Sequence, residues 1–261
     1  MPLKTDITPV VAIIQARMSS TRLPSKVMKP ICGKPLIWHV VNRLKAAKYL
    51  DDVMVATTTH PSDDVIEEWC SLTGVPSHRG SLDDVLSRYF GAATKAGART
   101  IVRITADCPL IEPELVDKAV EKFSEGVYDH VGVDSSFPDG LDCEVFSFDA
   151  LKKAHREARL ASEREHVTPY IWKNPVLFRL GAIKSNVDLS QMRWTVDDEK
   201  DLKLVTEIYE ALYRGEEVFH MAEILSFLKK NSRLLEINSM TARNEGYAKS
   251  LKEDRVVDNA V

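Results

Sequence analysis

The sequence has no long apolar run. Its longest uninterrupted apolar stretch is Val10–Ile14, whereas a membrane-spanning helix needs about 18 or more such residues. The first residues include Lys4, Asp6 and Pro9, so they lack the apolar segment of a secretory signal peptide. These two absences argue against a membrane protein and predict a cytoplasmic one.

The chain also lacks a basic surplus and closely spaced cysteines. Its 35 Lys and Arg residues and 39 Asp and Glu residues give a net charge of -4. A broad nucleic-acid-binding surface, which needs an excess of positive charge, is therefore not expected. The cysteines form no C-x-x-C pair, which predicts neither a zinc site nor a disulfide framework.

Glycine-rich phosphate-binding motifs are missing as well. Gly33-Lys34 is followed by Pro35 and has no glycine five residues upstream, so it is not a Walker A motif, and G-x-G-x-x-G does not occur. The sequence therefore lacks the characteristic motif of a P-loop ATPase and that of a nicotinamide-dependent dehydrogenase, and neither function is expected.

What is present is the composition of an ordinary globular chain, with 261 residues that are 44% hydrophobic and 28% charged. Short β-branched runs alternate with amphipathic helical segments, a pattern typical of an α/β fold with a mixed, mostly parallel sheet flanked by helices. Strands are expected at 10–15, 53–58, 100–105, 128–134, 141–148, 176–183 and 192–196. Helices are expected at 36–48, 63–72, 113–123, 150–159, 162–172, 199–214 and 221–229, with one more that Ser81 and Asp84 open as a capping box and that ends near residue 97.

The densest functional motif is the loop after the first predicted strand, residues 16–26, which we call the cation loop. It holds Arg17, Arg22 and Lys26 together with the hydroxyls of Ser19 and Ser20. Ligands of open α/β sheets bind at the carboxyl ends of strands, where such cations and backbone amides can bind phosphate oxygens. The alternative is a solvated basic loop without a ligand.

Two aspartates also follow predicted strands. Asp107 comes after the strand at 100–105 and Asp197 after the strand at 192–196, so both can reach the same sheet edge. One or two carboxylates together with substrate phosphates are enough to bind Mg²⁺. The alternatives are a turn or helix N-cap at Asp107 and the N-cap of the next helix at Asp197.

These motifs together resemble those of the sugar-activating cytidylyltransferases, which make CMP-sialic acid and CMP-Kdo, and are most similar to the spore coat polysaccharide biosynthesis protein F family. The resemblance covers nearly the whole chain. It rests on the segments 16–26, 33–36, 79–81, 84–89, 103–111, 142–146, 164–170, 193–197 and 243–247.

The resemblance implies a nucleotide-diphospho-sugar transferase-like, Rossmann-like domain over residues 1–242, with a sugar-binding and dimerising insertion at about 128–185 and a charged tail at 243–261. It implies transfer of CMP from CTP to a sugar hydroxyl with Mg²⁺, release of pyrophosphate, and a homodimer without nucleic-acid or membrane partners. Arg17, Lys26 and Asp107 would be catalytic, and Asp107 and Asp197 would bind the metal. The nucleotide would contact Ala16, Arg17, Ser19, Ser20, Arg22, Lys26, Arg79, Ser81 and Asp107.

One motif differs from the family pattern Val-Asp-Thr-Pro-Glu-Asp. The chain has Val196-Asp197-Asp198-Glu199-Lys200-Asp201. Because Asp198 is added beside Asp197, either carboxylate is a candidate for the metal.

The acceptor side is specified less sharply. Asp142 and Glu144 are two residues apart on a predicted strand and so share a face, where they could bind acceptor hydroxyl or amino groups, or pair with an arginine such as Arg179. Glu165 and His166 are further candidates, although Ser162 and Glu165 also have capping-box spacing.

Two other functions remain open. The same scaffold could use a different nucleotide or act as a glycosyltransferase, and a nucleotide-sensing subunit without turnover is the non-enzymatic alternative. A sugar acid or an amino sugar is the expected acceptor class.

Overall fold

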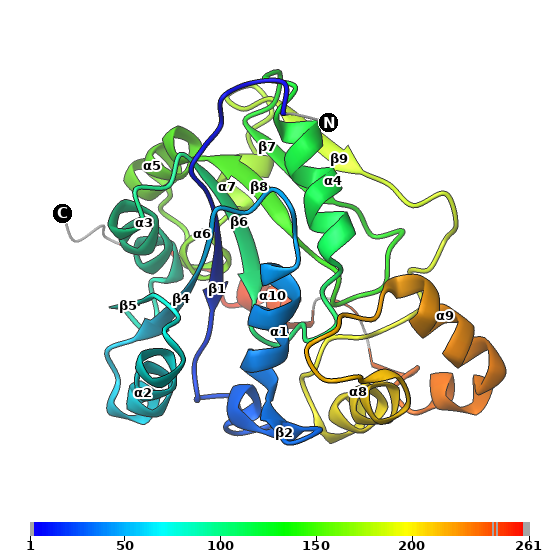
Figure 1. The fold of residues 1–261 in the computed structure, drawn as a ribbon. Coiled ribbons are helices and arrows are strands. Elements are labelled where there is room, and N and C mark those ends of the chain that lie inside the picture. Colours follow the sequence, from blue (N-terminus) through cyan, green and yellow to red (C-terminus); the bar gives the residue numbers. More distant parts are fainter. Residues whose placement is uncertain (1–2, 242, 244, 258–261) are drawn as a thin grey trace.

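The computed structural model describes residues 3–241, 243 and 245–257, which form one sheet between two helical layers (Figure 1). Within these residues the sheet has seven strands in the order β5-β4-β1-β6-β8-β7-β9. Their bounds are β1 Val10–Gln15, β4 Asp52–Thr58, β5 Ser77–Gly80, β6 Thr100–Thr105, β7 His130–Val133, β8 Glu144–Ser147 and β9 Leu180–Ile183. A separate hairpin pairs β2 Pro30–Ile31 with β3 Lys34–Pro35.

The sheet is mixed and mostly parallel, as predicted. β1 pairs in parallel with β4 and β6, and β4 with β5, whereas β8 runs antiparallel to both β6 and β7. The central strand β1 is an apolar, β-branched run whose first five residues are buried, which is typical of a strand covered on both faces. Because β1 and β6 pair in parallel, with Gln15 opposite Thr105, their carboxyl ends lie side by side.

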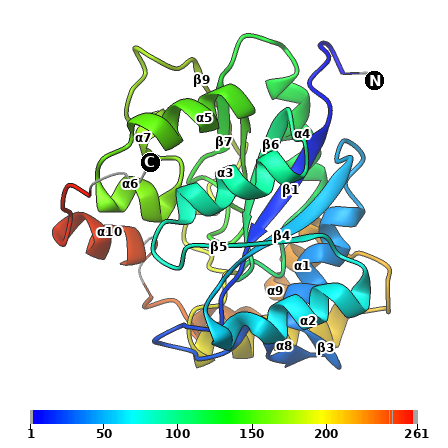
Figure 2. The same cartoon turned by 90° about the vertical axis from the view of Figure 1, so that its left-hand side faces the viewer.

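Helices cover both faces of the sheet (Figure 2). One face packs against α1 Leu36–Lys45, α2 Asp64–Thr73, α4 Pro113–Phe123, α8 Glu199–Leu212 and α9 Met221–Lys230. The other packs against α3 Val85–Lys95, α5 Phe148–Glu157 and α7 Pro169–Trp172, and α6 Ala161–His166 packs on α3. The last helix, α10 Glu245–Lys252, packs against α6.

The strand predicted at 192–196 is wrong. The segment is extended and buried at Trp194 and Val196, but in the described chain it forms only an isolated bridge, between Asp139 and Arg193. Trp194 N donates to Asp139 O at 2.6 Å, next to Gly140, which has a positive φ of 103° and where a Cβ would overlap the Thr195 backbone nitrogen. The apolar residues of this segment are explained by their burial in the core, and they do not indicate pairing in a sheet.

Helix beginnings differ from prediction at two capping motifs. The N-cap of α3 is Asp84, whose carboxylate accepts from Ser87 N at 2.9 Å, while the Ser81 hydroxyl accepts from Asp84 N. At α6 the carboxylate that turns back to the helix start belongs to Glu163, which accepts from Leu160 N at 3.1 Å, so Ser162 and Glu165 form no capping box. The predicted helix at 162–172 is also divided into α6 and α7, at Val167 with its positive φ of 73°.

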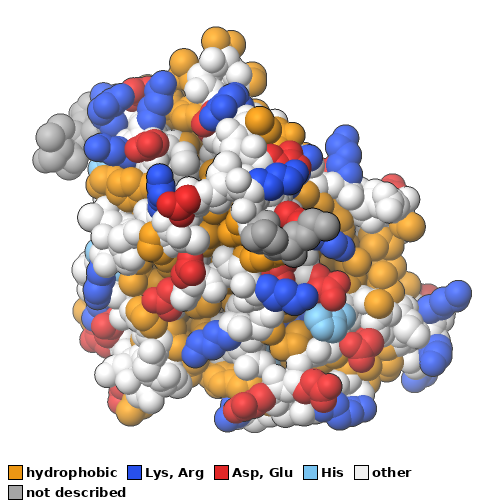
Figure 3. All heavy atoms as spheres, turned by 45° about the horizontal axis from the view of Figure 1, so that its top comes forward, with side chains coloured by type: hydrophobic (Ala, Val, Ile, Leu, Met, Phe, Trp, Pro, Cys, Tyr) orange, Lys and Arg blue, Asp and Glu red, His pale blue; other side chains and the backbone are white. Residues whose placement is uncertain are grey.

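Positively and negatively charged side chains are interspersed over the face shown in Figure 3. None of the helices in the described residues combines the length and the apolar composition that a membrane crossing requires.

Candidate active site

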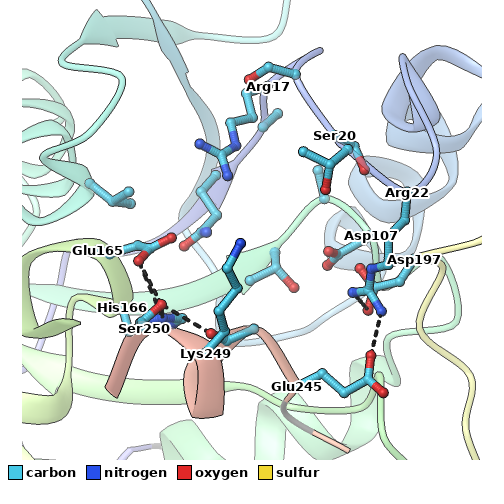
Figure 4. A pocket seen from close by; sticks show the side chains of 18 of the residues that line it. Arg17, Ser20, Arg22, Asp107, Glu165, His166, Asp197, Glu245, Lys249 and Ser250 are labelled. Atoms are coloured by element: carbon cyan, nitrogen blue, oxygen red, sulfur yellow. Dashed lines mark hydrogen bonds and ion pairs between the residues drawn. The ribbon is translucent and has the colours of Figure 1, made fainter. Parts of the chain in front are cut away.

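A cavity of about 930 Å³ opens at the carboxyl ends of β1 and β6. Its walls come from the cation loop, from the turn after β6, and from α6 and α10 (Figure 4). Ligand sites of open α/β sheets occur at this edge. The structure brings together around it the predicted residues Ala16, Arg17, Ser19, Ser20, Arg22, Lys26, Asp107, Glu165, His166 and Asp197.

The cation loop is held in place by a buried carboxylate. Asp63 is 1% exposed and accepts a hydrogen bond from Met18 N at 2.8 Å and another from the Thr58 hydroxyl. Within the loop, Ser25 N donates to Met18 O at 3.0 Å, and Ser25 has a left-handed φ of 60°. These bonds fix the backbone at Met18, so that Arg17 beside it points into the cavity (Figure 4).

The three cations of the loop have different surroundings. Arg22 pairs with Asp197 at 3.1 Å and with Glu245 at 2.9 Å, and Lys26 pairs with Asp107 and Asp197. Arg17 is exposed and makes no ion pair or side-chain hydrogen bond with any described residue. Its charge is therefore available to an anion in the cavity.

Lys26 lies between the two predicted metal-binding carboxylates. Its Nζ donates to Asp107 Oδ2 and to Asp197 Oδ1, both at 2.8 Å, and to Val196 O at 2.9 Å. Burial alone would raise the pKa of Asp107, but the Lys26 charge and hydrogen bond lower it below its usual range. Burial would likewise lower the pKa of Lys26, and the two carboxylates raise it instead. Both aspartates meet at one point of the cavity, as predicted from their positions after the strand at 100–105 and the extended segment at 192–196.

The structure separates the roles of Asp197 and Asp198. Asp198 is the N-cap of α8, where its carboxylate accepts from Lys200 N at 2.8 Å and from Asp201 N at 2.9 Å. Asp197 lines the cavity instead. The helix N-cap predicted as the alternative role of Asp197 is therefore provided by Asp198.

Asp197 is held by a buried ionic cluster. Arg193 donates to Asp197 Oδ2 at 2.7 Å, to Asp139 Oδ2 at 2.6 Å and to Asp201 Oδ1 at 3.0 Å. The Asp201 side chain is fully buried, and it also accepts from Asp197 N at 2.9 Å and from Asn238 Nδ2. Such a network fixes the backbone and the carboxylate of Asp197 together.

The carboxylates of Asp107 and Asp197 suit a hard divalent cation such as Mg²⁺. No group of three or more His, Cys, Asp or Glu side chains that could hold a metal occurs in the described part of the chain, but Mg²⁺ commonly takes only one or two protein carboxylates beside substrate phosphates. The spot between these two carboxylates already attracts a positive charge, that of Lys26. The donor set therefore fits the metal, and Asp107 Oδ1 is the carboxylate oxygen here that accepts no bond from Lys26, Arg22 or Arg193.

Arg79 and Ser81, predicted to contact the nucleotide, do not line the cavity. Arg79 donates to Thr58 O at 2.7 Å and pairs with Asp64 at 2.7 Å. The Ser81 hydroxyl accepts from Asp84 N at 3.0 Å. Each side chain thus has a partner within the protein. The contacts of Arg79 and Ser81 with the nucleotide stay predictions.

Asp142 and Glu144 also lie outside the cavity lining and do not share a strand, because β8 begins at Glu144. Asp142 pairs with Arg243 at 2.6 Å, and Glu144 pairs with Arg103 at 2.7 Å. Glu144 also accepts from Thr168 Oγ1 and bonds His130 Nε2 at 2.9 Å. The predicted arginine partner, Arg179, pairs with Asp129 instead. Acceptor contacts of Asp142 and Glu144 stay predictions.

Glu165 and His166 lie on the cavity wall formed by α6, and a residue of α10 joins them. The Ser250 hydroxyl donates to Glu165 Oε2 at 2.7 Å and lies 2.9 Å from His166 Nε2. Burial lowers the pKa of His166, which favours a neutral ring at pH 7. These two side chains therefore offer the cavity polar groups whose orientation is set by the C-terminal helix.

Sequence reasoning missed the contribution of α10 to the cavity. Glu245, Lys249 and Ser250 line it, as do Glu253 and Arg255 beyond the helix. The segment at 243–247 carried part of the family resemblance, and that was the one signal that the charged tail belongs to the site.

Comparison with known proteins places this geometry in a family. A family model described as cytidylyltransferase matches residues 11–256. An uncharacterised protein of Methanocaldococcus jannaschii is 39% identical over 242 residues, 91% of this chain and 97% of that protein. The spore coat polysaccharide biosynthesis protein SpsF of Bacillus subtilis is 29% identical over 229 residues, 85% of this chain and 95% of SpsF.

A solved structure agrees in fold and in sequence. The cytidylyltransferase of Leptospira borgpetersenii serovar Hardjo-bovis has a TM-score of 0.82 and 32% identity, over 87% of this chain and 96% of that one. The matched region contains the cation loop, both carboxylates and α10. The resemblance seen in the motifs is confirmed, and the chain belongs to the cytidylyltransferase family, enzymes of the nucleotidyltransferase type.

Proposed function

We propose that this enzyme transfers CMP from CTP to a hydroxyl group of a sugar and releases pyrophosphate. The acceptor oxygen bonds to the α-phosphorus, the bond from that phosphorus to the bridging oxygen of pyrophosphate breaks, and the hydroxyl proton is lost. The observation that carries the proposal is the meeting of two carboxylates, Asp107 and Asp197, around one cavity with Arg17, a cation that has no ion-pair partner among the described residues.

The cation loop supplies the positive charge that a triphosphate requires. In phosphoryl transfer the developing charge is spread over phosphate oxygens, so positioning and electrostatic stabilisation matter more than a covalent nucleophile. Arg17 binds a phosphate directly, because it has no partner of its own in the described chain. The hydroxyls and backbone amides of Ser19 and Ser20, at the cavity wall, add uncharged donors.

Asp107 and Asp197 are the residues that would hold Mg²⁺, which when bound neutralises phosphate charge and orients the triphosphate. Arg193 and Asp201 position Asp197 through the buried cluster. Lys26 balances the charges of the two carboxylates, and its charge lowers the pKa of Asp107, which keeps that carboxylate ionised.

The acceptor is a sugar acid or an amino sugar that lies near α6 and α10. Glu165 and His166 supply hydrogen-bonding groups on that wall. Similarity to SpsF, whose name refers to spore coat polysaccharide biosynthesis, supports a role in making surface polysaccharide. A homodimer formed through residues 128–185 belongs to the same proposal.

A pyrophosphate-release screen tests the function. Four nucleoside triphosphates are combined with acidic, amino and neutral sugars, with Mg²⁺ present or removed by chelation. We expect release that depends on CTP, on one acceptor class and on the metal. Pyrophosphate release with another nucleoside triphosphate would show that CTP is not the nucleotidyl donor. Turnover of a nucleotide-sugar without pyrophosphate release would indicate a glycosyltransferase.

A further inference from the structure

The C-terminal segment is fastened to the rest of the enzyme beyond α10. Ala161 N donates to Arg255 O at 2.8 Å, and Val257 N donates to Arg159 O at 2.8 Å. The Asp254 carboxylate accepts from Ser162 N at 3.0 Å and from its hydroxyl at 2.7 Å. This strand-like contact at the start of α6 fixes residues 254–257 beside the cavity.

Polar contacts also fix α10 itself. At its start Glu245 pairs with Arg22 of the cation loop at 2.9 Å, and near its end Ser250 bonds both Glu165 and His166 of α6. Between them the Tyr247 ring lies edge-on to the His166 ring, with centroids 4.9 Å apart. Contacts on both sides of the cavity mouth therefore set the rotation of the helix about its axis.

That rotation directs Lys249 into the cavity. In Figure 4 its side chain extends from α10 toward Arg17, which enters from the opposite wall. Lys249 makes no side-chain hydrogen bond or ion pair with any described residue, and Glu245, one turn earlier, is engaged with Arg22. Within the described residues neither Arg17 nor Lys249 is ion-paired, although Glu165 and Glu253 also line the cavity. Two such cations on opposite walls form a binding site for an oxyanion.

We propose that Lys249 and Arg17 bind one substrate oxyanion from opposite sides, so that the C-terminal helix is part of the substrate site. This inference rests on the proposed function. The oxyanion is either a phosphate group of CTP or an anionic group of the acceptor, and the contact of α10 with both the cation loop and α6 places Lys249 between these two sides.

The test uses the full-length enzyme with Lys249→Met, which keeps the aliphatic chain, and Lys249→Arg, which keeps the charge. Lys252→Met is the matched control, because Lys252 lies on the same helix and does not line the cavity. Calorimetry measures the Kd of CTP and of the acceptor separately, and pyrophosphate release gives the acceptor KM. Circular dichroism verifies folding, which should be unchanged because α10 buries none of its residues.

Loss of one charge-assisted contact weakens binding by about 10- to 100-fold. We expect this loss for CTP or for the acceptor in Lys249→Met, a partial recovery in Lys249→Arg and none of it in Lys252→Met. Weakened CTP binding assigns the oxyanion to the triphosphate, and weakened acceptor binding with normal CTP binding assigns it to the acceptor. Unchanged Kd values for both would overturn the proposal, whereas wild-type enzyme that binds CTP but never releases pyrophosphate would contradict only the proposed function.

Discussion

Arg17 stands apart from the other cations of its loop because its charge is not used inside the described protein. Replacing it with alanine should remove about 2 to 4 kcal/mol of transition-state stabilisation, comparable to losing one oxyanion donor. Stability should change by less than about 0.5 kcal/mol, since the side chain is exposed. Lys29→Ala is the control, because Lys29 follows the loop outside the cavity lining. Steady-state pyrophosphate release and thermal unfolding are measured for both variants. A near-normal kcat/KM in Arg17→Ala would contradict the proposal that Arg17 binds a phosphate.

Neighbouring aspartates should respond differently to substitution. Asp107→Asn and Asp197→Asn should each abolish metal-dependent turnover, because one remaining carboxylate orients the ion poorly. Asp198→Ala should keep its activity and lose about 1 kcal/mol of stability, the value of a helix N-cap. Activity assays at several Mg²⁺ concentrations, with urea unfolding, separate the three variants. If Asp198→Ala were inactive and Asp197→Asn active, the metal site would lie one residue further along.

At the level of elements, the strands and helices that follow from local pattern were predicted closely. β1 and β6 have the predicted bounds, because continuous β-branched runs between polar loops specify buried strands. α4 has its predicted bounds as well, since Pro113 starts it. The segment at 192–196 was mistaken for a strand because periodicity reports burial and not hydrogen-bond partners.

The candidate site was predictable only in part for a related reason. Arg17, Asp107 and Asp197 follow extended segments at one edge of the fold, so chain order alone indicated that they meet. Whether a carboxylate already has a partner depends on contacts far along the chain, as with Glu144 and Arg103, 41 residues apart. Arg22 and Glu245 are separated by 223 residues, and no local pattern places α10 against the cation loop.

Glu144 links two antiparallel strands and a helix, so we expect a structural effect from its loss. Glu144→Gln leaves the half-buried Arg103 without its counter-charge, and we expect a loss below the about 3 to 5 kcal/mol of a fully buried pair, about 1 to 3 kcal/mol. Unfolding in urea measures this loss, with Asp142→Asn as the comparison at a more exposed ion pair. A stable Glu144→Gln variant with a raised acceptor KM would instead support the predicted acceptor contact.

For the whole molecule, the same carboxylate contributes to the dependence of stability on pH. Burial would raise the pKa of Glu144, but its bond with His130 and the charge of Arg103 lower it to about 2. In the unfolded chain the pKa of a glutamate is about 4.3. The contribution of Glu144 to the free energy of unfolding is therefore fully present above that pH and is lost as the pH falls toward 2. The free-energy difference between wild type and Glu144→Gln should therefore shrink between pH 5 and pH 3. A difference that stays constant over this range would show that Glu144 is not stabilised as an anion.

The central claim is that one cavity, at the carboxyl ends of β1 and β6, joins CMP to a sugar. Phosphorus NMR of the complete reaction tests it directly, because it follows where the α-phosphorus of CTP goes. We predict one new phosphodiester signal for each pyrophosphate formed, with both signals absent in Asp107→Asn. Free CMP with pyrophosphate, or CDP with orthophosphate, would instead show hydrolysis of CTP and would contradict the account.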